Sequence, residues 1–246
     1  MWRKILRGIC FVILVVSLGI VAKEQYGFYK EREAKEKLEE LAGIPKEEEK
    51  EAEFSPDWNA LKQQNESVNG YLYFPECEIS FPVVQASDND YYLYRDIYQN
   101  PSEFGAVFMD WENNPAYTDT NTTIYGHAVT GGTGMFTELK RLQDEKFFRE
   151  NKEFTLYTPD MTYKCEIFAF EYINPYDIKF TTNFENEEQY NEWIEALKSQ
   201  SMYWRDLEVP NSKQRSITLS TCADGGANRF QVHARLVPVT DDSKAA

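Results

Sequence analysis

The stretch 218–234 most constrains the fold, because it has the pattern of two strands joined by a tight turn. The alternating segment Thr-Leu-Ser-Thr-Cys occupies 218–222, glycine-rich residues follow at 223–228, and a second alternating segment opens with Arg229. Small, glycine-containing turns between two such segments predict a β-hairpin. This hairpin sets the thiol of Cys222 beside a guanidinium, and a cation at that distance stabilises a thiolate or an oxyanion.

The register of the hairpin follows from the alternation of side chains along a strand. One face carries the pairs Cys222–Arg229, Ser220–Gln231 and Thr218–His233. The other face carries the apolar side chains Leu219, Phe230 and Val232. His233 lies four positions beyond Arg229, or about 13 Å along the strand, which makes it a poor proton partner for Cys222.

His127 is the better candidate for an acid or base, since the chain has only two histidines. A short β-branched and aromatic segment at 122–125 leads into Gly126, His127 and further small residues. Such a strand end opening into a loop often carries catalytic side chains. Taken singly, a strand-end cysteine is more often a small buried hydrophobe and an arginine a solvated charge. It is the combination that favours a functional site.

The segment Thr-Leu-Ser-Thr-Cys at 218–222, together with Arg229 and the Tyr-Gly-His segment at 125–127, resembles the sortases, the cysteine transpeptidases of Gram-positive cell surfaces. Segments 70–74, 79–85 and 88–93 resemble the opening of a class B sortase domain, and the resemblance covers residues 54–239. It implies a mainly β fold, a closed eight-stranded barrel with an N-terminal helix and a helical insertion before the catalytic strand.

The three candidate catalytic residues suit acyl transfer. A thiolate of Cys222 attacks a peptide carbonyl, the imidazolium of His127 protonates the departing amine, and Arg229 holds the developing oxyanion or the substrate backbone. The thioester can then pass to water or to an amine. The resemblance implies cleavage of a C-terminal sorting motif after its threonine and transfer of the surface protein to an amine of the peptidoglycan cross-bridge. No cofactor or metal is expected, because the histidines are not spaced as ligands.

The resemblance also suggests substrate-binding residues, namely Asn89, Leu93, Ser220 and Thr221. Class B sortases often carry an acidic residue directly after the cysteine, where this chain has Ala223. One expected substrate contact is therefore missing. Asp224 either orients His127 or shapes the Asp-Gly turn.

The sequence also fits functions other than transfer of surface proteins to the cell wall, to different degrees. A pilin-polymerising sortase and a non-catalytic, membrane-tethered β domain with a decayed site both remain open. Other Cys-His enzymes are disfavoured: cell-wall peptidases generally place the cysteine before the histidine, and L,D-transpeptidases carry a His-Gly-Cys cluster that this chain lacks.

The N-terminus has the pattern of a membrane anchor. Arg3, Lys4 and Arg7 precede an apolar run at 9–22. The run is short for a spanning helix and a signal peptide is the alternative, but counting from Ile5 with Arg7 snorkelling lengthens it. Basic residues ahead of the run keep the N-terminus in the cytoplasm, so a single-pass protein with an extracytoplasmic catalytic domain is expected.

The expected organisation is an anchor at 1–22, a charged stalk at 23–53, the catalytic domain at 54–239 and a short tail at 240–246. The stalk is dominated by Glu and Lys, which predicts a solvated, partly helical segment interrupted at 43–45. Lys and Arg total 26 against 41 Asp and Glu, a net charge of −15, which argues against a nucleic-acid partner.

Within the catalytic domain the patterns predict eight strands, at 71–74, 79–84, 106–109, 122–125, 154–157, 163–170, 217–221 and 230–237. Apolar residues at helical spacing predict one covering helix at 186–200. Another helix is expected to begin with Ser55 as N-cap and Pro56 as its first residue. Pairing of Cys77 with Cys165 is left open by the sequence.

Overall fold

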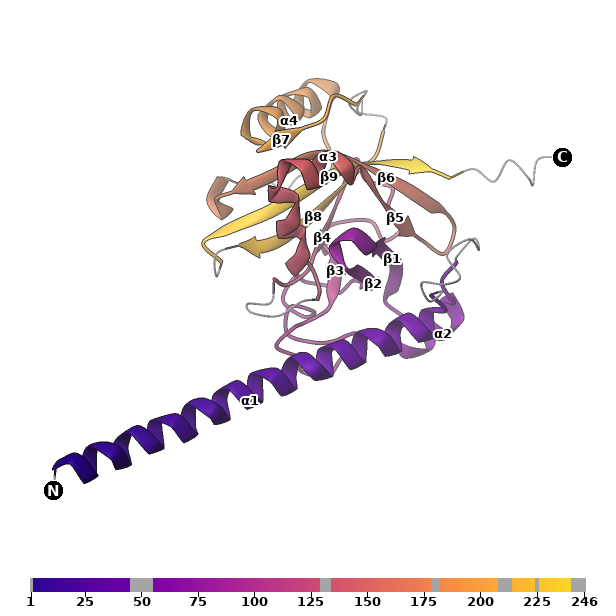
Figure 1. Ribbon diagram of the computed structural model, residues 1–246. Coiled ribbons are helices and arrows are strands. Elements are labelled where there is room, and N and C mark those ends of the chain that lie inside the picture. Colours follow the sequence, from indigo (N-terminus) through magenta and orange to yellow (C-terminus); the bar gives the residue numbers. More distant parts are fainter. Residues whose placement is uncertain are drawn as a thin grey trace.

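Alternating apolar and β-branched segments build a sheet at the centre of the protein, with helices around it (Figure 1). The computed structural model describes residues 2–44, 55–128, 134–177, 182–207, 214–223 and 226–239. Its strands are β1 (Val68–Phe74), β2 (Ile79–Val84), β3 (Val107–Met109), β4 (Asn121–Tyr125), β5 (Glu153–Tyr157), β6 (Thr162–Ile173), β7 (Tyr203–Trp204), β8 (Ser216–Ala223) and β9 (Asn228–Pro238). Its helices are α1 (Trp2–Ala42), α2 (Trp58–Gln64), α3 (Glu145–Glu150) and α4 (Glu187–Gln200), with short 3-10 turns η2 (Pro75–Cys77), η3 (Thr137–Gln143) and η4 (Pro175–Asp177).

The sheet closes on itself. Its strand order is β5-β1-β2-β3-β4-β8-β9-β6-β7, and β5 also pairs with β6. Eight strands therefore form a ring, and β7 is attached to the outside of it at β6. The expected closed eight-stranded barrel is confirmed, and each of the eight expected strands is present. The two-residue strand β7 was not predicted from the sequence, because so short a segment shows no detectable alternation of apolar and polar residues.

The barrel interior is apolar. Leu219 and Val232, which the hairpin register placed on the apolar face, are fully buried in the main hydrophobic cluster together with Ile124 of β4 and Phe136 of the following loop. Alternation thus separates an inner apolar face from an outer face that carries the polar pairs of β8 and β9.

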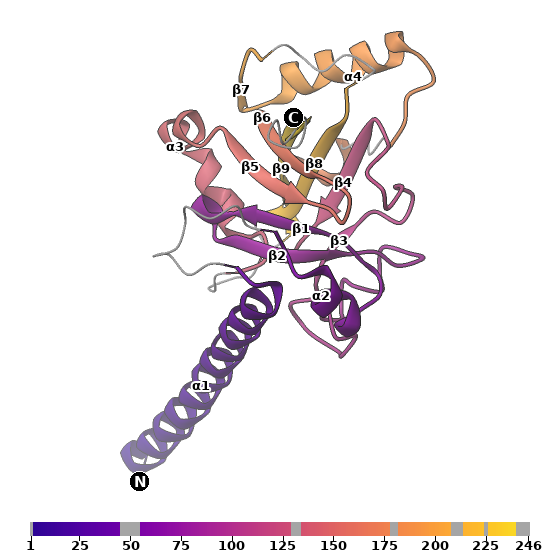
Figure 2. The same cartoon turned by 90° about the vertical axis from the view of Figure 1, so that its right-hand side faces the viewer.

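Helix α4 covers part of the outer face. Its N-cap is Asn186, whose side chain accepts a hydrogen bond from the backbone N–H of Gln189, and the expected helix is confirmed. The buried side chains Tyr190, Ile194 and Leu197 pack on the β6 residues Phe168 and Ala169. In both views α4 lies on the opposite side of the barrel from α1 (Figure 1 and Figure 2).

Helix α2 begins later than the sequence suggested. Asp57, and not Ser55, is the N-cap, and its carboxylate accepts a hydrogen bond from the backbone N–H of Ala60. Pro56 therefore precedes the cap instead of opening the helix. An aspartate caps a helix as well as a serine does, so residue type alone does not choose between positions 55 and 57.

Helix α1 is one continuous helix of 41 residues that ends at Ala42, with Gly43 in the left-handed conformation (φ 73°). It contains an 18-residue window of mean hydropathy 2.6 with none of its residues buried, so it is long and apolar enough to cross a membrane. The expected solvated, partly helical stalk is helical up to Ala42, but its last helical turns are not solvated on every side, since Leu38 and Ala42 are buried against the barrel. Residues 45–53 of the expected stalk, residue 54 of the expected catalytic domain and the expected tail at 240–246 lie outside the described residues.

Candidate active site

The β8–β9 hairpin has the register that the sequence predicted. Cys222 pairs with Arg229, Ser220 with Gln231 and Thr218 with His233. Both Cys222 and Arg229 are half-buried, so the outer face of the hairpin is accessible near its turn. Nη1 of Arg229 donates to the backbone oxygens of Gly226 and Asn228, each at 3.1 Å, which holds the guanidinium at the turn.

Strand β4 brings His127 to the hairpin. β4 and β8 are parallel neighbours, with Tyr125 paired to Ser220, and the N–H of Gly126 donates to the oxygen of Ser220 at 3.3 Å. Two residues further along each strand, His127 and Cys222 stand at equivalent positions. Neighbouring strands are about 4.8 Å apart and paired residues project from the same face. The neighbouring order β4-β8-β9 thus brings the segment that carries His127, just after β4, to the same end of the barrel as Cys222 of β8 and Arg229 of β9.

A backbone carbonyl fixes the orientation of the His127 ring. Nε2 of His127 lies 2.7 Å from the oxygen of Leu93, in the loop between β2 and β3. A carbonyl oxygen only accepts hydrogen bonds, so Nε2 carries the proton. Nδ1 is left as the nitrogen that can exchange a proton with a reacting group.

Gly105 packs directly against this ring. It has φ 62°, and a Cβ at this position would lie 2.7 Å from the backbone oxygens of Leu93 and Tyr92 and 3.0 Å from Cδ2 of His127. Only glycine combines this backbone conformation with so little space. Neither this glycine nor the carbonyl acceptor of Leu93 was predicted from the sequence, because a contact between residues that are 34 positions apart, such as Leu93 and His127, leaves no local pattern.

We expect Gly105→Ala to displace the ring of His127 and to lower kcat by roughly 10- to 100-fold, since small misplacements of a reacting group are costly. Gly43→Ala is the matched control, because Gly43 has a similar φ of 73° but nothing within 4 Å of its Cβ position. Peptide-cleavage kinetics of the two variants, with thermal melts, check this. Equal kcat values in both would contradict the assigned role of Gly105.

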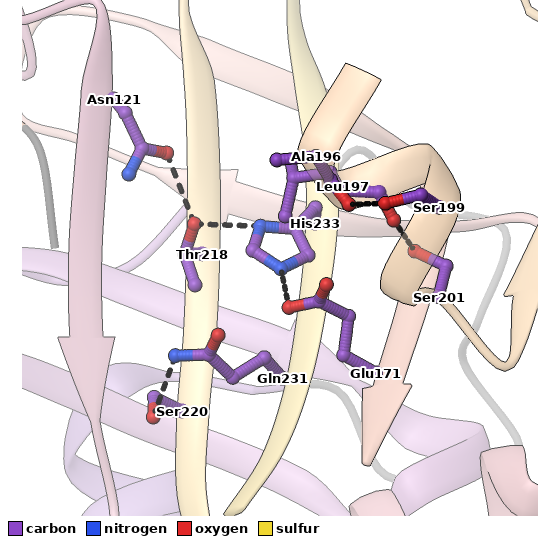
Figure 3. Close-up of polar contacts among 10 residues, drawn as sticks. All are labelled: Asn121, Glu171, Ala196, Leu197, Ser199, Ser201, Thr218, Ser220, Gln231 and His233. Atoms are coloured by element: carbon purple, nitrogen blue, oxygen red, sulfur yellow. Dashed lines mark hydrogen bonds and ion pairs between the residues drawn. The ribbon is translucent and has the colours of Figure 1, made fainter. Parts of the chain in front are cut away.

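The second histidine belongs to a buried polar network beneath α4 (Figure 3). Nδ1 of His233 lies 3.0 Å from the hydroxyl of Thr218 and Nε2 lies 3.2 Å from a carboxylate oxygen of Glu171. The hydroxyl of Thr218 donates onward to Asn121 at 3.0 Å. His233 and Glu171 are 3% and 1% exposed, so no substrate reaches them. Pairing of His233 with Oε2 of Glu171 makes this burial tolerable, while Oε1 of Glu171 has no hydrogen-bond partner within the described residues.

The suggested substrate-binding residues differ in accessibility. Asn89 is half-buried, donates to the carboxylate of Asp110 at 2.9 Å and accepts from the N–H of Trp111 at 3.0 Å, which ties two loops together. Leu93 is half-buried and lies beside His127. Ser220 and Thr221 are both buried, with 2% and 3% of their surface exposed, and their strand β8 is paired on both sides by β4 and β9. Asp224 lies outside the described residues.

The four cysteines are all free, which settles the question of a Cys77–Cys165 disulfide. Cys77 and Cys165 are buried, and this burial raises the pKa of both thiols well above the ordinary value. In the part of the chain that the structure describes, no group of three or more His, Cys, Asp or Glu residues could hold a metal ion.

Comparisons with known proteins show which family the chain belongs to. The family model described as "Sortase domain" matches residues 72–237. Sortase B of Listeria monocytogenes is 31% identical over 180 residues, 72% of each chain. The crystal structure of a Bacillus anthracis protein similar to sortase B has a TM-score of 0.76 at 30% identity, covering 87% of this chain and 98% of that one. Clostridium perfringens sortase B has a TM-score of 0.68 at 35% identity, covering 73% and 98%. The chain therefore belongs to the sortase family of cysteine transpeptidases, within class B.

Proposed function

We propose that Cys222 is the nucleophile, His127 the acid and base, and Arg229 the oxyanion-stabilising group of a transpeptidase that cleaves a C-terminal sorting motif after its threonine. The observation that carries this proposal is the adjacency of β4, β8 and β9, which gathers the ends of three strands at one rim. The half-buried state of all three side chains supports it, because a reacting group must be shielded and yet reachable.

The chemistry proceeds in two steps. The thiolate of Cys222 adds to the threonine carbonyl, while the guanidinium of Arg229 stabilises the negative oxygen. Nδ1 of His127 then gives its proton to the departing amine, and the thioester remains. In the second step an incoming amine gives a proton back to His127 as it attacks the thioester carbonyl, which frees the enzyme.

The acceptor is, in this proposal, an amine of the peptidoglycan cross-bridge, and the donor is a surface protein with a sorting signal. Asn89 and Leu93 are proposed to line the path of the sorting motif, with Ser220 and Thr221 flanking the nucleophile. The N-terminal part of α1 anchors the enzyme in the cell membrane as a single span, with the N-terminus cytoplasmic and the barrel outside. The bare apolar surface of that helix supports the anchor.

A peptide panel tests the proposed reaction. Asn-Pro, Ser-Pro and Leu-Pro sorting peptides are each offered to the enzyme with and without a glycine-based amine, and products are identified by mass spectrometry. We expect cleavage after threonine and, with the amine present, a ligated product. Hydrolysis that no amine diverts would contradict transpeptidation to the cross-bridge. Preference for a lysine side chain of a pilin-like protein would instead indicate a polymerising sortase.

Replacing Arg229 tests the oxyanion role. We expect Arg229→Ala to lower kcat/KM by about 10²- to 10³-fold, the usual cost of removing such a donor. Arg235→Ala is the control on the same strand, since Arg235 pairs with Glu166 away from the hairpin turn. It should keep full activity and lose only a little stability. Equal losses in both variants would contradict a specific role for Arg229.

A further inference from the structure

We propose that the active-site end of the barrel faces the lipid bilayer and that the loop at residues 94–104 lies at the level of the lipid headgroups. The proposal rests on the membrane anchor proposed above and goes beyond it. An anchor alone leaves the orientation of an enzyme open. Here the partner is a phospholipid surface, and the surface that meets it is defined by α1 and this loop.

Helix α1 couples the anchor rigidly to the barrel. The same uninterrupted helix contains the apolar segment and the turns that pack on the domain. Its end is fixed by the buried Leu38 and Ala42, by the N–H of Asp57, which donates to the oxygen of Ala42 at 3.0 Å, and by Nζ of Lys35, which donates to the oxygen of Glu78 at 2.7 Å. The direction in which the apolar segment leaves the barrel is thereby set.

The length of α1 gives the depth of the loop. Residues 5–22 span about 27 Å at 1.5 Å per residue, close to the ~30 Å thickness of the hydrocarbon core. Gly27 follows about 7 Å later, at the outer edge of the headgroup region. Phe104 lies 3.8 Å from the Cβ position of Gly27, and its ring centroid is 6.5 Å from that of Phe28. The loop that carries Phe104 is therefore held at headgroup depth.

Exposed tyrosines are concentrated at this depth. Tyr26 and Tyr29 of α1 are exposed, and in the loop Tyr94 and Tyr98 are 62% and 38% exposed. Tyrosine favours the membrane interface because its ring is apolar and its hydroxyl is polar. The loop also carries one arginine and two acidic residues, so its attraction to lipid is aromatic and not electrostatic.

The loop joins this surface to the active site. It is closed by the N–H of Ser102, which donates to the oxygen of Tyr94 at 3.0 Å, and the adjacent Leu93 oxygen holds the ring of His127. Figure 1 shows the end of β8 and the start of β9, which carry Cys222 and Arg229, on the side of the barrel toward which the N-terminal half of α1 extends. The opposite end of β6 and β9, marked by the Tyr163–Pro238 pair, points away. A substrate presented at the bilayer surface would thus reach Cys222 without leaving that surface.

Photo-cross-linking to lipid tests the orientation in the full chain. The photoreactive residue p-benzoyl-phenylalanine replaces Ile13 in the apolar segment, Tyr98 or, separately, Tyr94 in the loop, or Met161 as a control. Met161 is 41% exposed and directly precedes β6, at the far end of the barrel. Each protein is reconstituted in phosphatidylcholine nanodiscs and irradiated, and phospholipid adducts are mapped by mass spectrometry. Thermal melts establish that each protein is folded.

We expect adducts at positions 13, 98 and 94 and none above the unirradiated background at 161. Adducts at 13 with none at 98 or 94 would overturn the proposed surface and leave the anchor intact. Adducts at 161 equal to those at 98 would overturn the orientation. No adduct at 13 would overturn the anchor, and the present proposal with it. Adding phosphatidylglycerol should not change the yield at 98, and a strong dependence on it would contradict the aromatic mode of contact.

Discussion

Replacing Cys222 with alanine is expected to lower the rate of sorting-peptide cleavage by about 10⁴-fold or more, because no other group in the site can form the thioester. The variant should fold normally, since Cys222 is half-buried at the end of β8 and its pairing with Arg229 is made by the backbone. Cleavage assays followed by mass spectrometry, with thermal melts alongside, measure both effects.

The buried cysteines provide the control for this loss. Cys77→Ala removes a thiol that is 1% exposed, so it should cost about 1 kcal/mol of stability and leave kcat unchanged. Burial also raises the pKa of Cys77 and Cys165, so both stay protonated and unreactive at neutral pH. In a Cys10→Ser background, iodoacetamide should therefore modify the folded protein at Cys222 first. Full activity of Cys222→Ala would contradict the proposed nucleophile.

Replacing His127 with glutamine is expected to lower kcat by about 10²- to 10⁴-fold, the usual contribution of a general acid and base. The reason lies in position: His127 follows β4 next to the cysteine strand, and the carbonyl of Leu93 leaves Nδ1 free for proton transfer. The pH profile of kcat/KM should also lose one limb, a change that a loss of stability alone does not produce.

His233→Gln is the matched control among the chain's two histidines. The new amide can still donate to the carboxylate of Glu171, so the variant should fold, with a loss of about 1–3 kcal/mol in the free energy of unfolding. Its kcat and its pH profile should stay close to those of the unmodified enzyme. A large loss of kcat in His233→Gln, with His127→Gln still active, would reverse the assignment of the two histidines.

The sequence predicted local features of this protein well. The hairpin register of Cys222 and Arg229 could be derived because alternation and a short turn determine it within a dozen residues. Helix α4 was predicted because its apolar residues repeat at helical spacing. The prediction of Ser55 as the N-cap of α2 was wrong, because Ser55 and Asp57 are equally suitable N-cap residues and only tertiary contacts choose between them.

Features that depend on distant segments were not derivable from the residues. The position of His127 next to the cysteine strand depends on the parallel pairing of β4 with β8, whose paired residues are 95 positions apart, and no local pattern specifies this pairing. The residues indicated His127 only as the better placed of two histidines, and the resemblance to sortases supported that choice. The packing of Leu38 and Ala42 on the barrel was missed because two apolar residues in a charged helix give too weak a period.

The most direct test of the account is the mass of the enzyme during turnover of a sorting peptide without added amine. We predict an intact mass increased by the N-terminal peptide fragment less one water, with the adduct mapped to Cys222 and released by hydroxylamine. Turnover with no covalent adduct under rapid quenching, or an adduct of the same mass formed by Cys222→Ala, would contradict it.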